Sequence, residues 1–158
     1  ESAIRLMQIP TALDIPYSVN NIVGFPGETR ELAFDTIELN RYFKSDDTSC
    51  STLVPFHGTA IRKVCEKEGL LDPDEILAVS NSGEAVLDMP QWSREEIGKI
   101  QISLSMYVKN PKDRWPEIEL AETDPEIHQK LSEEFIDTFW SDPGGDISLN
   151  FKEAAKGL

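Results

Sequence analysis

The stretch Asn20-Asn21-Ile22-Val23-Gly24-Phe25-Pro26-Gly27-Glu28-Thr29 decides the fold. Its first residues complete a predicted strand over Ser18–Val23, because Val and Ile favour strands. The glycines of the turn that follows allow positive φ and close backbone approach. Thr29 can cap a helix, and Glu28 stands where a negative charge suits the positive helix end. Ligands of α/β sheets bind outside the carboxyl ends of the strands, so this turn is predicted to adjoin a small-molecule site.

A second strand and helix are predicted to follow. The first helix spans Thr29–Phe43, and the second strand spans Ser49–Val54. Thr59 can cap the next helix, which Gly69 ends. Strands and helices that alternate at these lengths predict parallel strands with a right-handed crossover. The apolar spacing predicts these inward residues: Leu32, Thr36, Leu39 and Phe43 with Ile37 beside them, then Ile61, Val64 and Cys65.

The later part of the chain is predicted to be mainly helical, after short strands over Ile76–Val79 and Ala85–Leu87. Ser93 and Glu96 have the spacing of a capping box, which opens a helix that stops before Pro111. The last dozen residues are expected to fray. The two long helices are predicted to turn these residues inward: Ile97, Ile100, Leu104 and Tyr107 or Val108, and then, after the cap Asp124, Ile127, Leu131, Phe135 and Phe139.

Three segments resemble radical S-adenosylmethionine (SAM) enzymes. Val23-Gly24-Phe25-Pro26-Gly27-Glu28-Thr29 is similar to their fifth-strand segment, and Leu53-Val54-Pro55-Phe56-His57-Gly58-Thr59 is similar to their sixth strand. The tail Asn110-Pro111-Lys112-Asp113-Arg114-Trp115-Pro116-Glu117-Ile118 resembles the C-terminal region of the branch with a cobalamin-binding domain upstream. The resemblance implies an α/β fold, with the C-terminal portion of a partial (β/α)6 barrel over residues 1–71 and a mainly helical extension over residues 72–158.

The resemblance also implies where SAM would bind and what this chain lacks. The family holds a [4Fe–4S] cluster with three cysteines spaced C-x3-C-x2-C, whereas this chain has only Cys50 and Cys65. Two thiolates cannot supply three ligands, so no residue of this chain is expected to bind metal. The residues that match the adenine side of the SAM site are Ile22, Gly24 and Phe25 on the first strand and Val54, Pro55 and Phe56 on the second.

We therefore expect the C-terminal fragment of a longer radical SAM enzyme, inactive without the missing N-terminal part. The chain begins at Glu1 inside a predicted helix. The fragment would supply the adenine-side wall and part of the cap over a small-molecule substrate. The cluster, and cobalamin if the parent protein uses it, would be ligated outside this chain. The alternative is a non-catalytic binding or scaffold module derived from a half-barrel. In either case an exposed strand edge favours a homo-oligomer.

The composition disfavours a nucleic-acid partner, because the net charge is −14, from 29 acidic and 15 basic residues. Gly24-Phe25-Pro26-Gly27 also fits the G-x-x-G clamp of RNA-binding KH domains, but only Arg30 is a nearby cation. No Lys-Ser or Lys-Thr follows, which argues against a Walker A loop. No apolar stretch approaches the roughly 20 residues of a membrane span. Two cysteines without a disulfide pattern indicate a reducing, cytoplasmic setting.

The remaining chemically capable side chains are interpreted as structural, and no catalytic residue is assigned. His57 follows the second strand and could carry a proton, but a solvated turn histidine is favoured. His128 is expected on a helix surface, and Cys65 in the core. Cys50 is not expected to be reactive. Trp115 is expected to anchor the packing of the tail.

Overall fold

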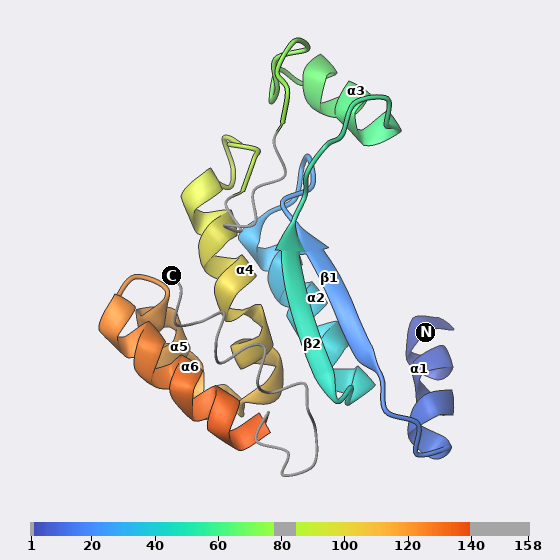
Figure 1. Cartoon of the computed structure of the whole chain (residues 1–158), viewed down its shortest axis with the longest axis vertical. Helices are drawn as coiled ribbons and strands as arrows, with labels where there is room; N and C mark the ends of the chain where they lie inside the picture. Colours follow the sequence, from blue (N-terminus) through green and yellow to red (C-terminus); the bar gives the residue numbers. More distant parts are fainter. Residues whose placement is uncertain (1, 78–84, 140–158) are drawn as a thin grey trace. The chain divides into compact units, whose positions relative to one another are not determined.

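The computed structural model describes residues 2–77 and 85–139 (Figure 1). Its contacts define two units, Glu1–Trp115 and Pro116–Leu158. No helix in the described part is long and apolar enough to cross a membrane. The elements, in chain order, are α1 Ser2–Ala12, β1 Ser18–Val23, α2 Arg30–Phe43, β2 Asp47–Thr52, α3 Ala60–Lys67, α4 Arg94–Lys109, the 3-10 helix η1 Lys112–Arg114, α5 Trp115–Ala121 and α6 Pro125–Phe139.

The sheet consists of β1 and β2, which run parallel as the sequence predicts. Ser18 pairs with Asp47 and Val23 pairs with Thr52 in an unbroken register. β2 begins and ends two residues earlier than predicted. Leu53 still donates its N–H to the Val23 carbonyl at 2.8 Å, but the chain then leaves the ladder. The described chain is therefore mixed α/β, as expected, with one strand shifted.

The inward face of α2 differs from the prediction. Leu32 and Leu39, expected inside, are 49% and 37% exposed. The Nδ2 of Asn40 donates to Asn21 Oδ1 on β1 and to the Thr36 carbonyl, both at 2.8 Å. A buried amide requires such partners, so the helix turns Asn40 rather than Leu39 toward the strand. The buried residues of α2 are Ala33, Ile37, Asn40 and Phe43.

Helix α4 packs against β2, β1 and α2 and closes the core of the first unit. The Ser93 hydroxyl accepts the Glu96 N–H, and the Glu96 carboxylate accepts the Ser93 N–H at 2.9 Å, which confirms the capping box. The helix ends before Pro111, as predicted. Its buried residues include every one predicted: Ile97, Ile100, Leu104, Tyr107 and Val108. The amphipathic pattern was therefore sufficient for this element.

The short strands predicted before α4 are not found in the described residues. Ala85–Leu87 forms no strand, because no neighbouring strand pairs with it and the Val86 carbonyl accepts a hydrogen bond from Arg94 Nη2 at 2.7 Å. An antiparallel bridge joins Met89 and Trp92 instead. Residues 76–77 are not in a strand either, and residues 78–79 lie outside the described part.

Cationic side chains join the ends of α2 and α4. Lys109 Nζ, on α4, donates to the carbonyls of Ser45 and Asp46, which follow α2. Helix ends leave such carbonyls without helical partners, and a cation satisfies them strongly. In return, Arg41 Nη1 of α2 donates to three carbonyls at the end of α4, at 2.9, 3.0 and 2.6 Å: those of Tyr107, Val108 and Asn110.

Trp115 packs at this junction, in line with the anchoring role expected of it. Its ring centroid lies 5.5 Å from that of Phe34 and 5.4 Å from that of Tyr107. Its Nε1 donates to the Tyr107 carbonyl at 3.2 Å. Arg41 and Lys112 lie over the ring, at 5.7 and 5.0 Å from its centroid. An indole with a satisfied N–H and two cations on its faces is a strong anchor.

Asp124 caps α6, as predicted, because its Oδ1 accepts the N–H groups of Glu126 and Ile127. Only part of the predicted stripe of α6 is inside: Leu131 is buried, but Phe139 is 41% exposed. Residues 140–158, on which the prediction of fraying falls, lie outside the described part.

His128 is less exposed than the sequence predicts. It is half-buried, and its Nε2 is buried without a hydrogen-bond partner among the described residues. Burial lowers the pKa of His128 below its ordinary value of 6.5. The folded chain therefore resists protonation of this ring, whereas the unfolded chain does not.

The first prediction concerns the Arg41 contacts. Replacing Arg41 with Met keeps the stem but removes the donors to three carbonyls, so the free energy of unfolding should fall by about 2 kcal/mol. Urea titration followed by circular dichroism measures it. Arg5→Met, at an exposed position of α1, is the control and should change stability by less than about 0.5 kcal/mol. Equal losses would contradict the role given to Arg41.

The second prediction concerns pH. Because the folded-state pKa of His128 is lowered, its contribution to stability is full above pH 6.5 and is lost as the pH falls through the folded value. The melting temperature should therefore fall more between pH 7 and pH 5 in the parent chain than in His128→Gln, which has nothing to titrate. Parallel pH profiles of the two chains would show that His128 is not the group responsible.

Candidate site at the carboxyl ends of the strands

Gly24 lets the core approach the end of β1 closely. Its φ is +88°, and it is buried. A Cβ at this position would lie 3.1 Å from Ile97 Cγ2 of α4, which is closer than side chains normally tolerate. Glycine is therefore needed at position 24 for two reasons: the backbone has positive φ, and a side chain would collide with Ile97.

The Glu28 side chain, at the end of the turn that follows Gly24, reaches back and bonds to the backbone at its start. Glu28 Oε2 accepts the N–H of Gly24 at 2.6 Å and that of Phe25 at 2.9 Å. The Glu28 carbonyl in turn accepts the side-chain amide of Gln91 at 3.1 Å. Two convergent backbone N–H groups could otherwise bind a phosphate. Because a carboxylate already occupies them, this turn does not provide an anion site.

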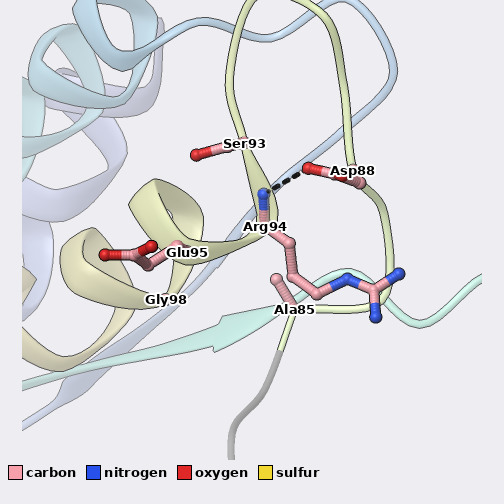
Figure 2. A pocket seen from close by; sticks show the side chains of 6 residues that line it. All are labelled: Ala85, Asp88, Ser93, Arg94, Glu95 and Gly98. Atoms are coloured by element: carbon pink, nitrogen blue, oxygen red, sulfur yellow. Dashed lines mark hydrogen bonds between the residues drawn. The ribbon is translucent and has the colours of Figure 1, made fainter.

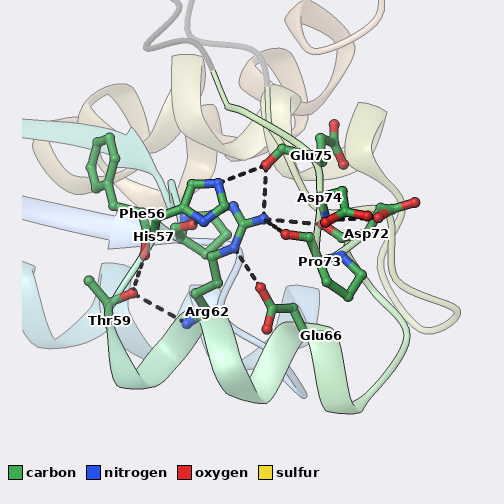
Figure 3. A network of polar contacts seen from close by, with 10 residues as sticks. Phe56, His57, Thr59, Arg62, Glu66, Asp72, Pro73, Asp74 and Glu75 are labelled. Carbon is green, nitrogen blue, oxygen red and sulfur yellow. Dashed lines mark hydrogen bonds and ion pairs between the residues drawn. The ribbon is translucent and has the colours of Figure 1, made fainter.

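The exit of β2 is held by Arg62, which is 2% exposed (Figure 3). Its Nε pairs with Glu66 Oε1 at 2.7 Å. The other guanidinium nitrogens donate to four carbonyls, those of Pro55, Asp72, Pro73 and Glu75, at 3.4, 3.1, 3.1 and 2.8 Å. A buried arginine satisfied in this way fixes the loop after β2 against the loop after α3.

This network corrects the predicted face of α3. Val64, expected inside, is 39% exposed, and Arg62 is buried in the helix instead. Cys65 is buried, as predicted. Gly69 has a φ of +71°, and the N–H groups of Gly69 and Leu70 bond back to the last turn, so the predicted helix end is confirmed.

Neither of the chemically capable side chains near the sheet is set up for catalysis. His57 is exposed, and its Nε2 lies 3.1 Å from the Glu75 carbonyl, which agrees with a turn histidine. Burial, with Glu28 nearby, raises the pKa of the Cys50 thiol to about 12, so its reactive thiolate is scarce. In the described part of the chain, no three His, Cys, Asp or Glu side chains gather as a metal site requires.

The six predicted site residues lie at or just beyond the carboxyl ends of β1 and β2, because the two strands are parallel and paired in register. Three of them present apolar surface: Ile22, Phe25 and Phe56 are 51%, 39% and 49% exposed. The other three support them, because Gly24 and Pro55 are buried and Val54 is half-buried. The exposed side chains at this end of the sheet are therefore aromatic or aliphatic, the kind that contacts an apolar or planar ligand.

A separate pocket of about 500 Å³ lies beside the first turns of α4 (Figure 2). Its polar groups are already engaged: Arg94 N–H donates to Asp88 at 2.9 Å, and Glu95 pairs with Lys99 at 2.6 Å. None of the six predicted site residues lines it. The described residues that line it are Ala85, Asp88, Ser93, Arg94, Glu95 and Gly98.

Reasoning from the sequence missed two residues that shape the site. Arg62 was overlooked because an isolated arginine on a helix usually faces water. Glu28 was interpreted only as a partner of the helix dipole, although its distance of four residues from Gly24 allows it to reach back across the turn. The available signal was a proline in the loop on either side of α3, Pro55 and Pro73, whose carbonyls accept hydrogen bonds from Arg62.

No protein-family model, curated protein or solved structure matches this chain. The interpretation of the site consequently depends on its own geometry and on the resemblance of the two strand-end motifs.

The third prediction separates the two reasons for a glycine at position 24. Gly27 also has positive φ, at +78°, but a Cβ there would meet nothing within 4 Å. Gly27→Ala should lower the free energy of unfolding by about 1 kcal/mol, from backbone strain alone. Gly24→Ala should lower it by about 3 kcal/mol, because the methyl also meets Ile97. Thermal or urea unfolding measures both free energies. Equal decreases for the two variants would mean that α4 moves to accommodate the added methyl group, and would contradict the prediction.

Proposed function

We propose that this chain is the C-terminal part of a radical SAM enzyme and forms the adenine-side wall of the SAM site. The observation that carries the proposal is the apolar surface at the ends of two adjacent parallel strands. Ile22 is exposed on β1, and Phe25 and Phe56 are exposed on the turns after β1 and β2, which Glu28 and Arg62 hold by hydrogen bonds to the backbone. Adenine is planar and needs such a surface on one side.

The charge of the site region agrees with SAM better than with a nucleotide phosphate. The Glu28 carboxylate already binds the backbone N–H groups of Gly24 and Phe25, so these two amides are not available to a phosphate. The chain carries a net charge of −14. SAM has a sulfonium and an ammonium against one carboxylate, so an acidic protein attracts it.

The outer face of the sheet agrees with a place inside a partial (β/α)6 barrel. Helices α2 and α4 lie toward one face, while Ser18, Asn20 and Ser49 on the other face are exposed. Ser49 Oγ donates to Asn20 Oδ1 at 2.6 Å, which ties the two strands across this face. In a barrel this face, which also carries Ile22 at its carboxyl end, would line the interior, where the substrate is held. The [4Fe–4S] cluster and any cobalamin would be bound by other parts of the parent protein.

The fourth prediction tests SAM binding directly. Adding SAM to the 15N-labelled chain should shift the amide signals at positions 22, 25 and 56, and AMP should shift them less because its phosphate finds no donor. Phe56→Ala should weaken binding about tenfold. Phe139→Ala, which removes a similarly exposed ring on α6, is the control and should leave binding unchanged.

Ile22→Asn, with Ile102→Asn as its equally exposed control, repeats the test on the strand itself. A folded chain that shows no shift with SAM, or the same loss for Phe56→Ala and Phe139→Ala, would overturn the proposal. The alternative of a non-catalytic binding module would then be favoured. For the parent protein, anaerobic reconstitution should give reductive SAM cleavage, and its absence in a fully loaded protein would also count against the assignment.

A further inference from the structure

A cavity of about 360 Å³ lies at the amino ends of β1 and β2. Its lining comes from two segments that lead into the strands: the end of α1 with the connection to β1, and the connection from α2 to β2. The candidate SAM site lies at the carboxyl ends, which a strand of six residues places roughly 16 Å away. None of the six predicted site residues lines this cavity, so it is a separate place on the molecule.

Tyr17 fixes the two lining segments against each other. Its N–H donates to Asp46 Oδ2 at 2.9 Å, its carbonyl accepts the Asp46 N–H at 3.0 Å, and its hydroxyl donates to the Phe43 carbonyl at the end of α2. The N–H of Ile15 donates to the Pro10 carbonyl at 2.9 Å, which folds the connection back onto α1. Because hydrogen bonds already hold its walls, the cavity needs little rearrangement to admit a ligand.

Two opposite charges on this lining, Asp14 and Lys44, are not paired. Within residues 2–77 and 85–139, neither side chain forms an ion pair or a hydrogen bond. Asp46 uses Oδ2 for the Tyr17 N–H, and its Oδ1 accepts no hydrogen bond from this part of the chain. A cavity that presents an ammonium and a carboxylate which do not pair with each other is complementary to a ligand that carries both charges.

Asp14 and Lys44 also share an uncommon backbone conformation. Their φ values are +54° and +52°, and no other described residue except glycine has a positive φ. Aspartate tolerates this region, but lysine does not favour it, and Lys44 ends α2 at a position where glycine is the ordinary choice. Both residues line the same cavity. An unfavourable backbone conformation that recurs at one cavity indicates that these two side chains have a role there.

We propose that this cavity binds a small zwitterion, an α-amino acid with an aliphatic side chain. Lys44 Nζ pairs with the carboxylate of the ligand, while Asp14 and Asp46 Oδ1 accept hydrogen bonds from its ammonium group. Ile15 and Pro16, which also line the cavity, contact the aliphatic side chain. The site does not depend on the proposed SAM site, because the two lie at opposite ends of the strands.

The fifth prediction tests the two charges of the ligand separately. L-Leucine should shift the amide signals at positions 14, 15, 17 and 44–46 of the 15N-labelled chain and leave those at positions 22, 25 and 56 in place. L-Leucinamide lacks the carboxylate and N-acetyl-L-leucine lacks the ammonium group, so each should bind about tenfold more weakly than leucine. Failure of the SAM assignment would not affect this result, since that assignment is tested on the other signals.

Matched variants assign each charge to its residue. Lys44→Met should weaken leucine binding about tenfold and leave leucinamide binding unchanged, because only the carboxylate uses the ammonium of lysine. Asp14→Asn should weaken leucine binding by a similar factor and leave N-acetyl-leucine binding unchanged. The controls are Lys63→Met and Asp35→Asn, at exposed positions of α3 and α2, and both should bind leucine like the parent chain.

Lys44→Gly separates a role in binding from a role in folding. Glycine suits the left-handed backbone but has no ammonium, so the melting temperature should rise while leucine binding falls about tenfold. The proposal is overturned if leucine up to about 20 mM shifts none of the signals around the cavity. It is also overturned if leucinamide binds as tightly as leucine, which would indicate a site for amines, or if Lys44→Met weakens the binding of both equally.

Discussion

Two parallel strands do not hold together on their own in water, and the first unit depends on α4 to cover their inner face. That cover requires the helix to come close to the end of β1, which is possible because Gly24 has no side chain in the path of Ile97. The same glycine shapes the turn at the candidate site. Packing of the core and geometry of the site are therefore set by one close approach, and the apolar strand-end surface is rigid for the same reason.

Several cationic side chains of this acidic chain donate to backbone carbonyls of other segments. Arg41 and Lys109 close the ends of α4 and α2, and Arg62 fixes the loops on either side of α3. Surface carboxylates could have competed for these side chains, but exposed pairs contribute little to stability, whereas a buried guanidinium with carbonyl acceptors contributes more. The ends of α2 and α4 and the loops on either side of α3 are consequently held together by hydrogen bonds from cationic side chains to backbone carbonyls.

How far the sequence predicts this structure depends on the kind of signal. Local rules succeeded: Thr29, Thr59 and Asp124 cap their helices, and the parallel pair follows from the strand–helix alternation. Apolar spacing succeeded for α4, which has one clear stripe, but only in part for α2 and α3: Ile37, Phe43 and Cys65 are buried as predicted, whereas Leu32, Leu39 and Val64 are exposed. There a buried polar side chain, Asn40 or Arg62, takes the place of an apolar one, and its partners lie far along the chain or on loop carbonyls. The sequence predicts a candidate site after β1 and β2, but it does not predict that Glu28 closes the turn after β1.

The helix that covers the sheet comes late in the chain. More than forty residues separate Thr52, the end of β2, from Arg94, the start of α4. During synthesis β1, α2 and β2 must therefore emerge from the ribosome and wait before their apolar inner face can be buried. Contacts between such distant residues slow folding and leave strands exposed in the meantime. A nascent chain halted before α4 therefore lacks the helix that covers the inner face of β1 and β2.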